Sequence, residues 1–352
     1  SPLLSGIADY LGNKKFFLKL FCYVGSISCM SLYFFSLENI IFSLITYLLA
    51  LIGFWGSLVF YNSYLPDIAH KEQQDKISAK GFSLGYVGSV ILLLICLAMV
   101  MMVEETQAIQ MMKYSFLLVG IWWIGFSQYT YYYLPDNKNS NKMHKNLIFN
   151  GFRELLKVWH QIKNILPLKR YLAAFFVYSM AVQTIMIIAA YFGEKEVQWG
   201  SDSKRTTGLI ISILVIQLVA VFGAWITSKL VEKFGNIKVL MLLNFLWILI
   251  CTYAYFVVTP NDFYIAAFFV GLVMGGIQSL SRSTYSKFIP SDTKDTTSFF
   301  SFYDVAEKVG IVIGMLTYGY IADITGKIQN AILFLILFFI VGLLLLLRVP
   351  KN

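Results

Sequence analysis

The chain contains ten long apolar runs, most of them separated by short charged loops. A helix needs about 20 apolar residues to cross the ~30 Å hydrocarbon core of a bilayer, and the runs have about that length. They lack the period-two alternation of a membrane β-barrel, whereas helices satisfy their own backbone hydrogen bonds in lipid. Composition agrees, because 58% of the residues are hydrophobic and only 13% are charged. The sequence therefore predicts an all-α polytopic membrane protein.

The predicted crossings are 16–35, 40–61, 81–103, 114–134, 171–192, 207–231, 239–258, 263–280, 297–321 and 328–347. Of the 28 lysine and arginine residues, 22 lie in alternate loops, just beyond them at Lys19, or at the C-terminus. These loops are 9–15, 66–80, 135–170, 229–238 and 282–296. The positive-inside rule places them in the cytoplasm, and a bacterial inner membrane is the expected location. The +9 net charge is thus a topology signal and not a sign of nucleic-acid binding.

The longest interruption, 135–170, separates four crossings from six. It predicts three parts: an incomplete N-terminal lobe (1–134), a cytoplasmic linker (135–170) and a C-terminal lobe (171–352). The linker begins with a polar stretch, 136–142, and continues as an amphipathic helix that Pro167 ends. The apolar face of this helix consists of Ile148, Phe152, Leu155, Leu156, Trp159, Ile162 and Leu166. Two placements remain open, along the headgroup surface or against the underside of the bundle.

An internal repeat supports two lobes. Segments 5–15 and 228–238 both place an acid three residues before a glycine, followed by asparagine and then lysine. The matching residues are Asp9, Gly12, Lys14 and Lys15 in the first segment, and Glu232, Gly235 and Lys238 in the second. Glycine permits a tight reversal between helices, the acid can approach a helix N-terminus, and the lysines can neutralise it or touch lipid phosphate. Such repeats are typical of secondary transporters.

Segment 5–15 resembles the loop signature of the major facilitator superfamily, which joins helices two and three of twelve. Asp9, Gly12, Lys14 and Lys15 match that signature, whereas Tyr10 and Asn13 replace its arginines and Ser5 replaces its first glycine. The resemblance implies that the ten spans are helices three to twelve and that an N-terminal segment precedes them in the complete protein.

Four further segments are similar to one branch of that superfamily, the autophagy-related vacuolar amino-acid effluxers and their bacterial relatives. They are YNSYLP (61–66), SAKGFSLGYVG (78–88), GGIQSLSRS (275–283) and FFSFYDVAEK (299–308). The resemblance implies a two-lobe major-facilitator bundle that moves a small solute, an amino acid or a related metabolite, by alternating access and outward from the cell. One departure is Met180, which stands where the branch carries an acid in helix seven.

Ionisable side chains inside a span cost at least a few kcal/mol, so they usually face a partner or water. Asp304, Glu307 and Lys308 have the spacing of one helical face. They form either an acid–base group that binds a zwitterion or takes up a proton, or an internal ion pair that holds helices together. Arg282, at the end of the preceding span, either pairs with Asp304 as a cytoplasmic gate or is an ordinary helix-end arginine.

The neutral candidates for the solute cavity are the amides Gln183 and Gln278, which lie in segments that resemble the family. All three histidines fall in predicted cytoplasmic loops, and no zinc-protease, P-loop or Gly-x-Ser-x-Gly motif occurs. We therefore expect no enzyme activity, no cofactor, no metal and no nucleic-acid partner. The expected partners are a solute, the bilayer and, as a hypothesis, protons, for a monomeric protein. The alternatives are a drug or lipid exporter of the same fold and a non-transporting scaffold or receptor.

Overall fold

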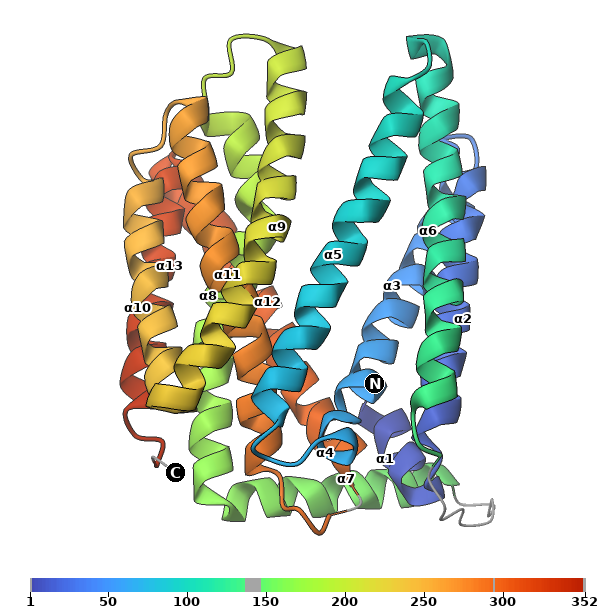
Figure 1. Ribbon diagram of the computed structural model, residues 1–352, viewed down its shortest axis with the longest axis vertical. Helices are drawn as coiled ribbons and strands as arrows, with labels where there is room; N and C mark the ends of the chain where they lie inside the picture. Colours follow the sequence, from blue (N-terminus) through green and yellow to red (C-terminus); the bar gives the residue numbers. More distant parts are fainter. Residues whose placement is uncertain (1, 137–146, 294, 351–352) are drawn as a thin grey trace. The chain divides into compact units, whose positions relative to one another are not determined.

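The computed structural model describes residues 2–136, 147–293 and 295–350, and the secondary structure of this part is helical throughout (Figure 1). The polar stretch expected at 136–142 lies outside the described residues except for Asp136. The helices are α1 (Pro2–Leu11), α2 (Lys14–Ser31), the 3-10 turn η1 (Leu32–Phe34), α3 (Ile40–Asn62), α4 (Leu65–Ile68), α5 (Gln74–Met101), α6 (Glu105–Tyr133), α7 (Leu147–Asn164), α8 (Leu166–Glu196), α9 (Asp202–Phe234), α10 (Asn236–Ala254), α11 (Pro260–Phe288), α12 (Thr296–Thr325) and α13 (Ile328–Leu346).

Each predicted crossing coincides with one long helix, so the all-α membrane fold is confirmed. Nine of these helices are long and apolar enough to cross a membrane, counted over the described residues. The tenth, α12, is 30 residues long and carries Asp304, Glu307 and Lys308, whose charges lower its hydropathy. Hydropathy alone therefore understates α12 as a span because of its ionisable groups.

Several helices extend beyond the predicted crossings at their positively charged ends. α5 begins at Gln74 and not at Gly81, α8 begins at Leu166 and not at Tyr171, and α11 continues to Phe288. The reason is that hydropathy detects only the part of a helix that lies in lipid. The helix itself can continue beyond the lipid, where polar side chains contact water or polar partners. Pro167 lies in the first turn of α8, where its missing N–H costs nothing.

The chain divides into two compact units. Unit 1 comprises Ser1–Ile68, Ile91–His160 and Ser291–Phe302, and unit 2 comprises Ala69–Val90, Gln161–Pro290 and Tyr303–Asn352. Consequently the first part of α5 belongs to unit 2, and the first turns of α12 belong to unit 1. The last residues of α7, from Gln161 on, belong to unit 2, whereas the rest of α7 belongs to unit 1, so three helices contribute to both units.

In unit 1, α2 packs against α3 and α6. Small residues bring these backbones together, because a Cβ on Gly53 would lie 2.8 Å from the carbonyl oxygen of Phe21. Phe17 stacks on Phe60 with ring centroids 5.6 Å apart. The buried core of this unit consists of Ile7, Ala8, Leu11, Phe17, Leu18, Cys22, Phe60, Tyr64 and Tyr131.

In unit 2, α9 and α11 have the most extensive contact of the helix pairs among the described residues. Glycines again permit the approach, since a Cβ on Gly271 would lie 2.5 Å from the carbonyl oxygen of Ile216. α10 and α13 meet through Trp247 and Phe339, whose rings stack at 5.6 Å with an interplanar angle of 5°. This packing fixes the helices that carry most of the ionisable and amide groups considered next.

Candidate functional site

The three ionisable side chains of α12 lie together in unit 2. The Nζ of Lys308 is 2.8 Å from Oε2 of Glu307 and 3.5 Å from Oδ1 of Asp304. The side chains of Asp304, Glu307 and Lys308 are 14%, 18% and 27% exposed, so this charge is largely removed from solvent. The helical spacing predicted from the sequence does bring the three groups onto one face. With all three ionised, the group carries a net charge of −1.

Gln183 of α8 completes this cluster. Its Nε2 donates to Oε1 of Glu307 at 2.7 Å, so both carboxylate oxygens of Glu307 are bonded. We call Gln183, Asp304, Glu307 and Lys308 the charged cluster. No group of three or more histidine, cysteine or acidic side chains suited to a metal ion is found among the described residues. The chemistry available here is ion pairing, hydrogen bonding and proton uptake.

Met180, the departure noted in the sequence, packs between α8 and α12. A Cβ on Gly310 of α12 would lie 3.3 Å from Cγ of Met180 and 3.5 Å from the Oγ of Ser179. Met180 is buried, and its flexible apolar side chain fills the space beside the glycine. An acid at this position would be desolvated against α12. The carboxylates described in this region, Asp304 and Glu307, both lie on α12.

Gln278 of α11 lies in a separate polar group of unit 2. Its Oε1 accepts from the Tyr86 hydroxyl at 2.5 Å, and its Nε2 lies 3.2 Å from the sulfur of Met186. These contacts join α5, α8 and α11. Tyr86 and Met186 are not members of the charged cluster. The two glutamines singled out from the sequence thus occupy different surroundings.

Arg282 is buried and joins α11 to α5. Its Nε donates to Oγ of Ser78 at 3.0 Å, an Nη donates to the Ser78 carbonyl at 3.2 Å, and its guanidinium lies 4.6 Å from the ring centroid of Phe82. Asp304 forms its ion pair with Lys308. The Arg282–Asp304 gate pair stays a prediction. Ser78 belongs to the family-like segment 78–88, but its role as the anchor of Arg282 was not foreseen.

In unit 1, the loop-signature segment holds the N-terminus of α12. The carboxylate of Asp9 accepts backbone N–H bonds from Thr297 at 3.3 Å and Ser298 at 2.6 Å. The first N–H groups of a helix have no partner within it, and a nearby negative charge is favourable there. Burial raises the pKa of Asp9 to about 7, although these hydrogen bonds and Lys14 act in the opposite direction.

The two lysines of this segment have distinct partners. Lys14 is buried, forms an ion pair with Asp67, and donates to the Ser63 carbonyl and to Oγ1 of Thr296, both at 3.1 Å. Lys15 donates to the Leu134 carbonyl at 2.9 Å and lies 2.8 Å from Asp136.

Gly12 adopts a φ of 64°, the left-handed conformation that the reversal between α1 and α2 requires. The segment therefore ties α1 and α2 to the starts of α4 and α12, through Asp67 and the Thr296–Ser298 turn.

The repeated segment in unit 2 is built differently. Gly235 has a φ of 81° between α9 and α10, as the reversal requires, but Glu232 is exposed and pairs only locally, 3.4 Å from Lys229. The contact to another helix start comes from Asn236, whose Nδ2 donates to Asp75 at 2.7 Å and to Thr284 at 3.0 Å. Asn236 occupies the repeat position of Asn13.

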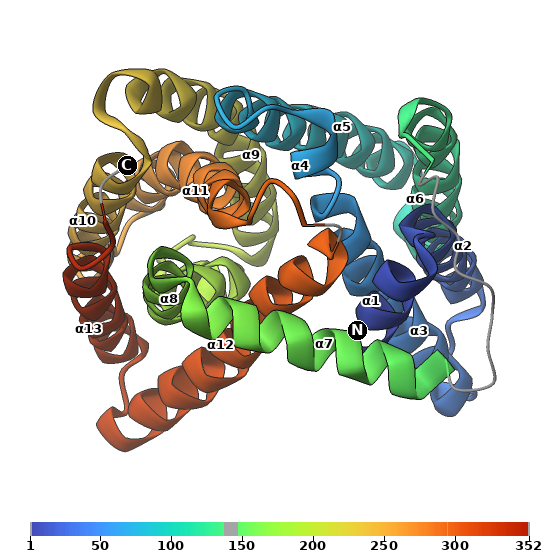
Figure 2. The same cartoon turned by 90° about the horizontal axis from the view of Figure 1, so that it is seen from below.

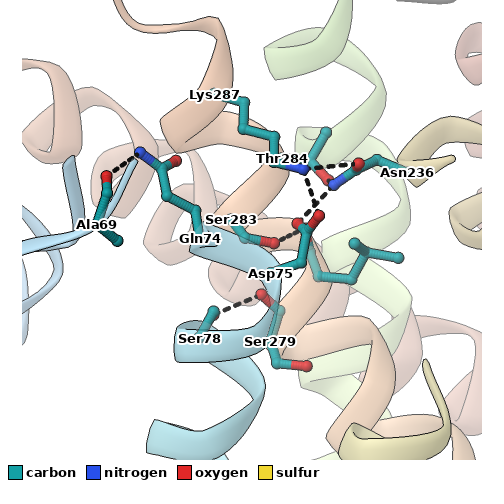
Figure 3. A network of polar contacts seen from close by, with 10 residues as sticks. Ala69, Gln74, Asp75, Ser78, Asn236, Ser279, Ser283, Thr284 and Lys287 are labelled. Carbon is teal, nitrogen blue, oxygen red and sulfur yellow. Dashed lines mark hydrogen bonds and ion pairs between the residues drawn. The ribbon is translucent and has the colours of Figure 1, made fainter. Parts of the chain in front are cut away.

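Lys287 closes this second network, which Figure 3 shows from close by. Its ammonium pairs with Asp75 and donates to Oδ1 of Asn236 at 3.1 Å. We call Asp75, Asn236, Thr284 and Lys287 the Asp75 latch, because they join the first turn of α5 to α10 and α11. From the sequence, Lys287 counted only as a positive charge of loop 282–296, and Asp75 was not singled out. The repeated asparagine was no guide to this contact, because Asn13 of the first segment accepts a hydrogen bond from the N–H of Phe16 at the start of its own helix α2.

Comparisons with known proteins agree with this architecture. The family model described as "Vacuole effluxer Atg22 like" matches residues 1–352. The MFS-type transporter YxiO of Bacillus subtilis is 32% identical over 360 residues, which cover 100% of this chain and 81% of YxiO. Autophagy-related protein 22 of Vanderwaltozyma polyspora is 24% identical and is covered over 55% of its length, against 78% of this chain. The chain thus spans about half the length of that fungal relative.

Solved structures show the same fold. The major facilitator transporter FucP, in the outward conformation, superposes with a TM-score of 0.74 at 14% identity, covering 100% of this chain and 86% of FucP. The proton:xylose symporter XylE gives a TM-score of 0.67 at 12% identity, covering 99% of this chain and 84% of XylE. At such identities the likeness concerns the fold alone. Together with the family match along its whole length, this shows that the chain belongs to the Atg22-like effluxer family of major facilitator superfamily transporters.

Proposed function

We propose that this transporter exports amino acids or related small zwitterionic metabolites by alternating access. The observation that carries the proposal is the charged cluster, in which Lys308, two carboxylates and the Gln183 amide meet inside a membrane-spanning helix pair. Buried ionisable groups in a span are costly and mark solute or proton pathways. The relatives named for autophagy-related protein 22 belong to an effluxer family, which supports outward movement.

The cluster offers complementary partners to both ends of a zwitterion. The solute carboxylate takes the place of Glu307 at the ammonium of Lys308, and the solute ammonium group pairs with Asp304. Glu307, released from Lys308, then takes up a proton, with the Gln183 amide still within reach. This exchange couples solute binding to proton binding at one carboxylate.

The proposed movement breaks and re-forms contacts at the helix ends. Asp9 at the start of α12, and the Asp75 latch at the start of α5, each tie one half of the sequence to the other half. In the proposed cycle the lobes 1–134 and 171–352 rock, these contacts break and re-form, and 135–170 links the lobes. We propose a monomer in the bacterial cytoplasmic membrane, with the positively charged loops inside.

The test is efflux from liposomes that contain the full-length protein and are loaded with a mixture of labelled amino acids. We expect selective efflux that a pH gradient accelerates, and loss of this acceleration in Glu307→Gln. Glu194→Gln, near the C-terminal end of α8, is the matched control and should behave as wild type. Wild-type pH dependence in Glu307→Gln would eliminate Glu307 as the coupling group.

A second candidate, export of apolar drugs or lipids, is favoured by one observation. Unit 2 contains a cavity lined entirely by apolar or sulfur-containing residues of α8, α9, α10, α11 and α13, among them Ile188, Phe192, Ile216, Cys251 and Val270. This candidate predicts that Gln183→Leu and Gln278→Leu leave transport intact. Absence of any flux from folded protein would favour the scaffold or receptor alternative.

A further inference from the structure

The linker helix α7 has three faces that differ in burial and chemistry. One face is buried in the protein, because Gly151, Leu155 and Val158 are covered and a Cβ on Gly151 would lie 2.6 Å from Ile7 of α1. These residues therefore dock α7 against α1. Docking onto the protein was one of the two placements that the sequence left open. The expected apolar face was, however, broader than this buried strip.

A second, apolar stripe stays exposed on α7. Phe152, Leu156 and Trp159 are 53%, 44% and 39% exposed. At about 100° per residue, the centre of this stripe lies roughly 90° around the helix from the centre of the buried face. The stripe therefore runs along one flank of α7. Trp159 rests partly on Phe302, with ring centroids 5.5 Å apart.

The third face is polar and lies opposite the buried one. Arg153 and His160 are exposed on it. Lys157, farther round, pairs with Asp295 at 2.8 Å and with Glu154 at 2.6 Å. The helix thus has one face against the protein, an opposite polar face and an apolar flank between them. Such a helix suits the edge of a membrane protein, where protein, water and lipid meet.

The position of α7 along the chain identifies what covers the apolar flank. A single residue, Ile165, separates the end of α7 from α8, a candidate membrane span. This short link holds α7 at the membrane boundary. Figures 1 and 2 show α7 beside α1, the helix of unit 1 that it contacts. Lys163 follows Trp159 by four residues, so a cation continues the stripe at headgroup level.

We propose that the flank formed by Phe152, Leu156 and Trp159 inserts into the boundary between headgroups and acyl chains of the leaflet on the positively charged side. Tryptophan is enriched at this depth, and amphipathic helices bury their apolar face ~5–10 Å into that boundary. The linker is thereby a membrane-surface element that slides in the interface while its other face holds α1. This inference does not depend on the identity of the solute.

Fluorescent labels on single cysteines test the proposal in the full-length protein in liposomes, with the four native cysteines replaced. Phe152→Cys and Leu156→Cys report on the flank, and Arg153→Cys and His160→Cys are matched controls on the polar face of the same helix. All four positions are exposed, so labelling does not require unfolding. Two quenchers are compared, lipids doxyl-labelled near the headgroup and aqueous iodide.

We expect doxyl lipids to quench the flank labels at least twofold more than the control labels, and iodide to show the reverse order. Equal quenching at flank and control positions would overturn the proposal. Flank labels shielded from both quenchers would also overturn it, because a second copy of the chain would then be covering the stripe.

Discussion

Breaking the Asp75 latch should release the start of α5 from α10 and α11. Lys287→Met keeps the aliphatic stem of the side chain but removes the ammonium that bonds Asp75 and Asn236. The side chains of Lys287 and Asp75 are 22% and 10% exposed, which places this pair between a surface pair and a buried one. Surface pairs contribute up to about 1 kcal/mol, whereas breaking a buried pair costs about 3–5 kcal/mol.

We therefore expect a loss of about 2 kcal/mol, intermediate between those limits. This corresponds to a shift of about 30-fold towards the state in which the latch is open. Ser283 of α11 is fully buried and lies beside Asp75 (Figure 3), so Ser283→Cys reports on opening. In a background without native cysteines, we expect its labelling by an impermeant maleimide to accelerate about 30-fold with Lys287→Met.

The exposed Lys229–Glu232 pair provides the matched control, because its side chains are 54% and 58% exposed. Lys229→Met should leave the labelling rate within about twofold of wild type, as expected for a surface pair. The double variant Asp75→Lys with Lys287→Asp should recover part of the protection. Unchanged labelling in Lys287→Met, or a double variant as open as the single one, would refute the latch.

Three further variants test other parts of the structure. Asp9→Asn should flatten the pH dependence of thermal stability. Burial raises the pKa of Asp9 to about 7, so the folded state favours the protonated side chain. The contribution of Asp9 to the free energy of unfolding is therefore present below pH 3.8 and is lost as the pH rises through 7. Melting temperatures at pH 5 and pH 8 measure this, and an unchanged difference in the variant contradicts it. Gly275→Ala should destabilise the protein by about 1–3 kcal/mol, because its Cβ would meet the backbone of Ala220, whereas Gly85→Ala has open space and should be neutral; equal melting temperatures would refute the packing argument. Gln183→Leu should abolish amino-acid efflux by leaving an oxygen of Glu307 without its donor, and wild-type efflux would remove Gln183 from the solute site.

The sequence was sufficient for the spans and for local spacing, because both depend on short-range patterns. Hydropathy located every long helix, and the three- and four-residue spacings correctly grouped Asp304, Glu307 and Lys308. The predicted helix ends were less accurate, since α5 and α11 extend beyond their apolar segments. In these extensions Asp75 and Lys287 form an ion pair. Helix length beyond the lipid is set by such polar partners, which hydropathy does not detect.

Contacts between distant segments could not be derived from the sequence. The sequence left Arg282 either as a partner of Asp304 or as an ordinary helix-end arginine, and it did not indicate the contacts of Arg282 with Ser78 and Phe82 of α5. The internal repeat predicted equivalent roles for Asp9 and Glu232, whereas in unit 2 Asn236 makes the contact to another helix and Glu232 faces solvent. A repeat in sequence preserves the glycine reversal, because backbone geometry is local. It does not preserve the partner, which is chosen by packing.

The central claim is that the charged cluster handles the solute, and Lys308→Ala tests it most directly. The full-length protein and this variant are reconstituted in liposomes, and efflux of labelled amino acids is followed with and without a pH gradient. Lys195→Ala, an exposed lysine near the end of α8, is the matched control. We predict selective, gradient-sensitive efflux that is lost in Lys308→Ala and retained in Lys195→Ala. Efflux by folded Lys308→Ala at the wild-type rate would contradict the account.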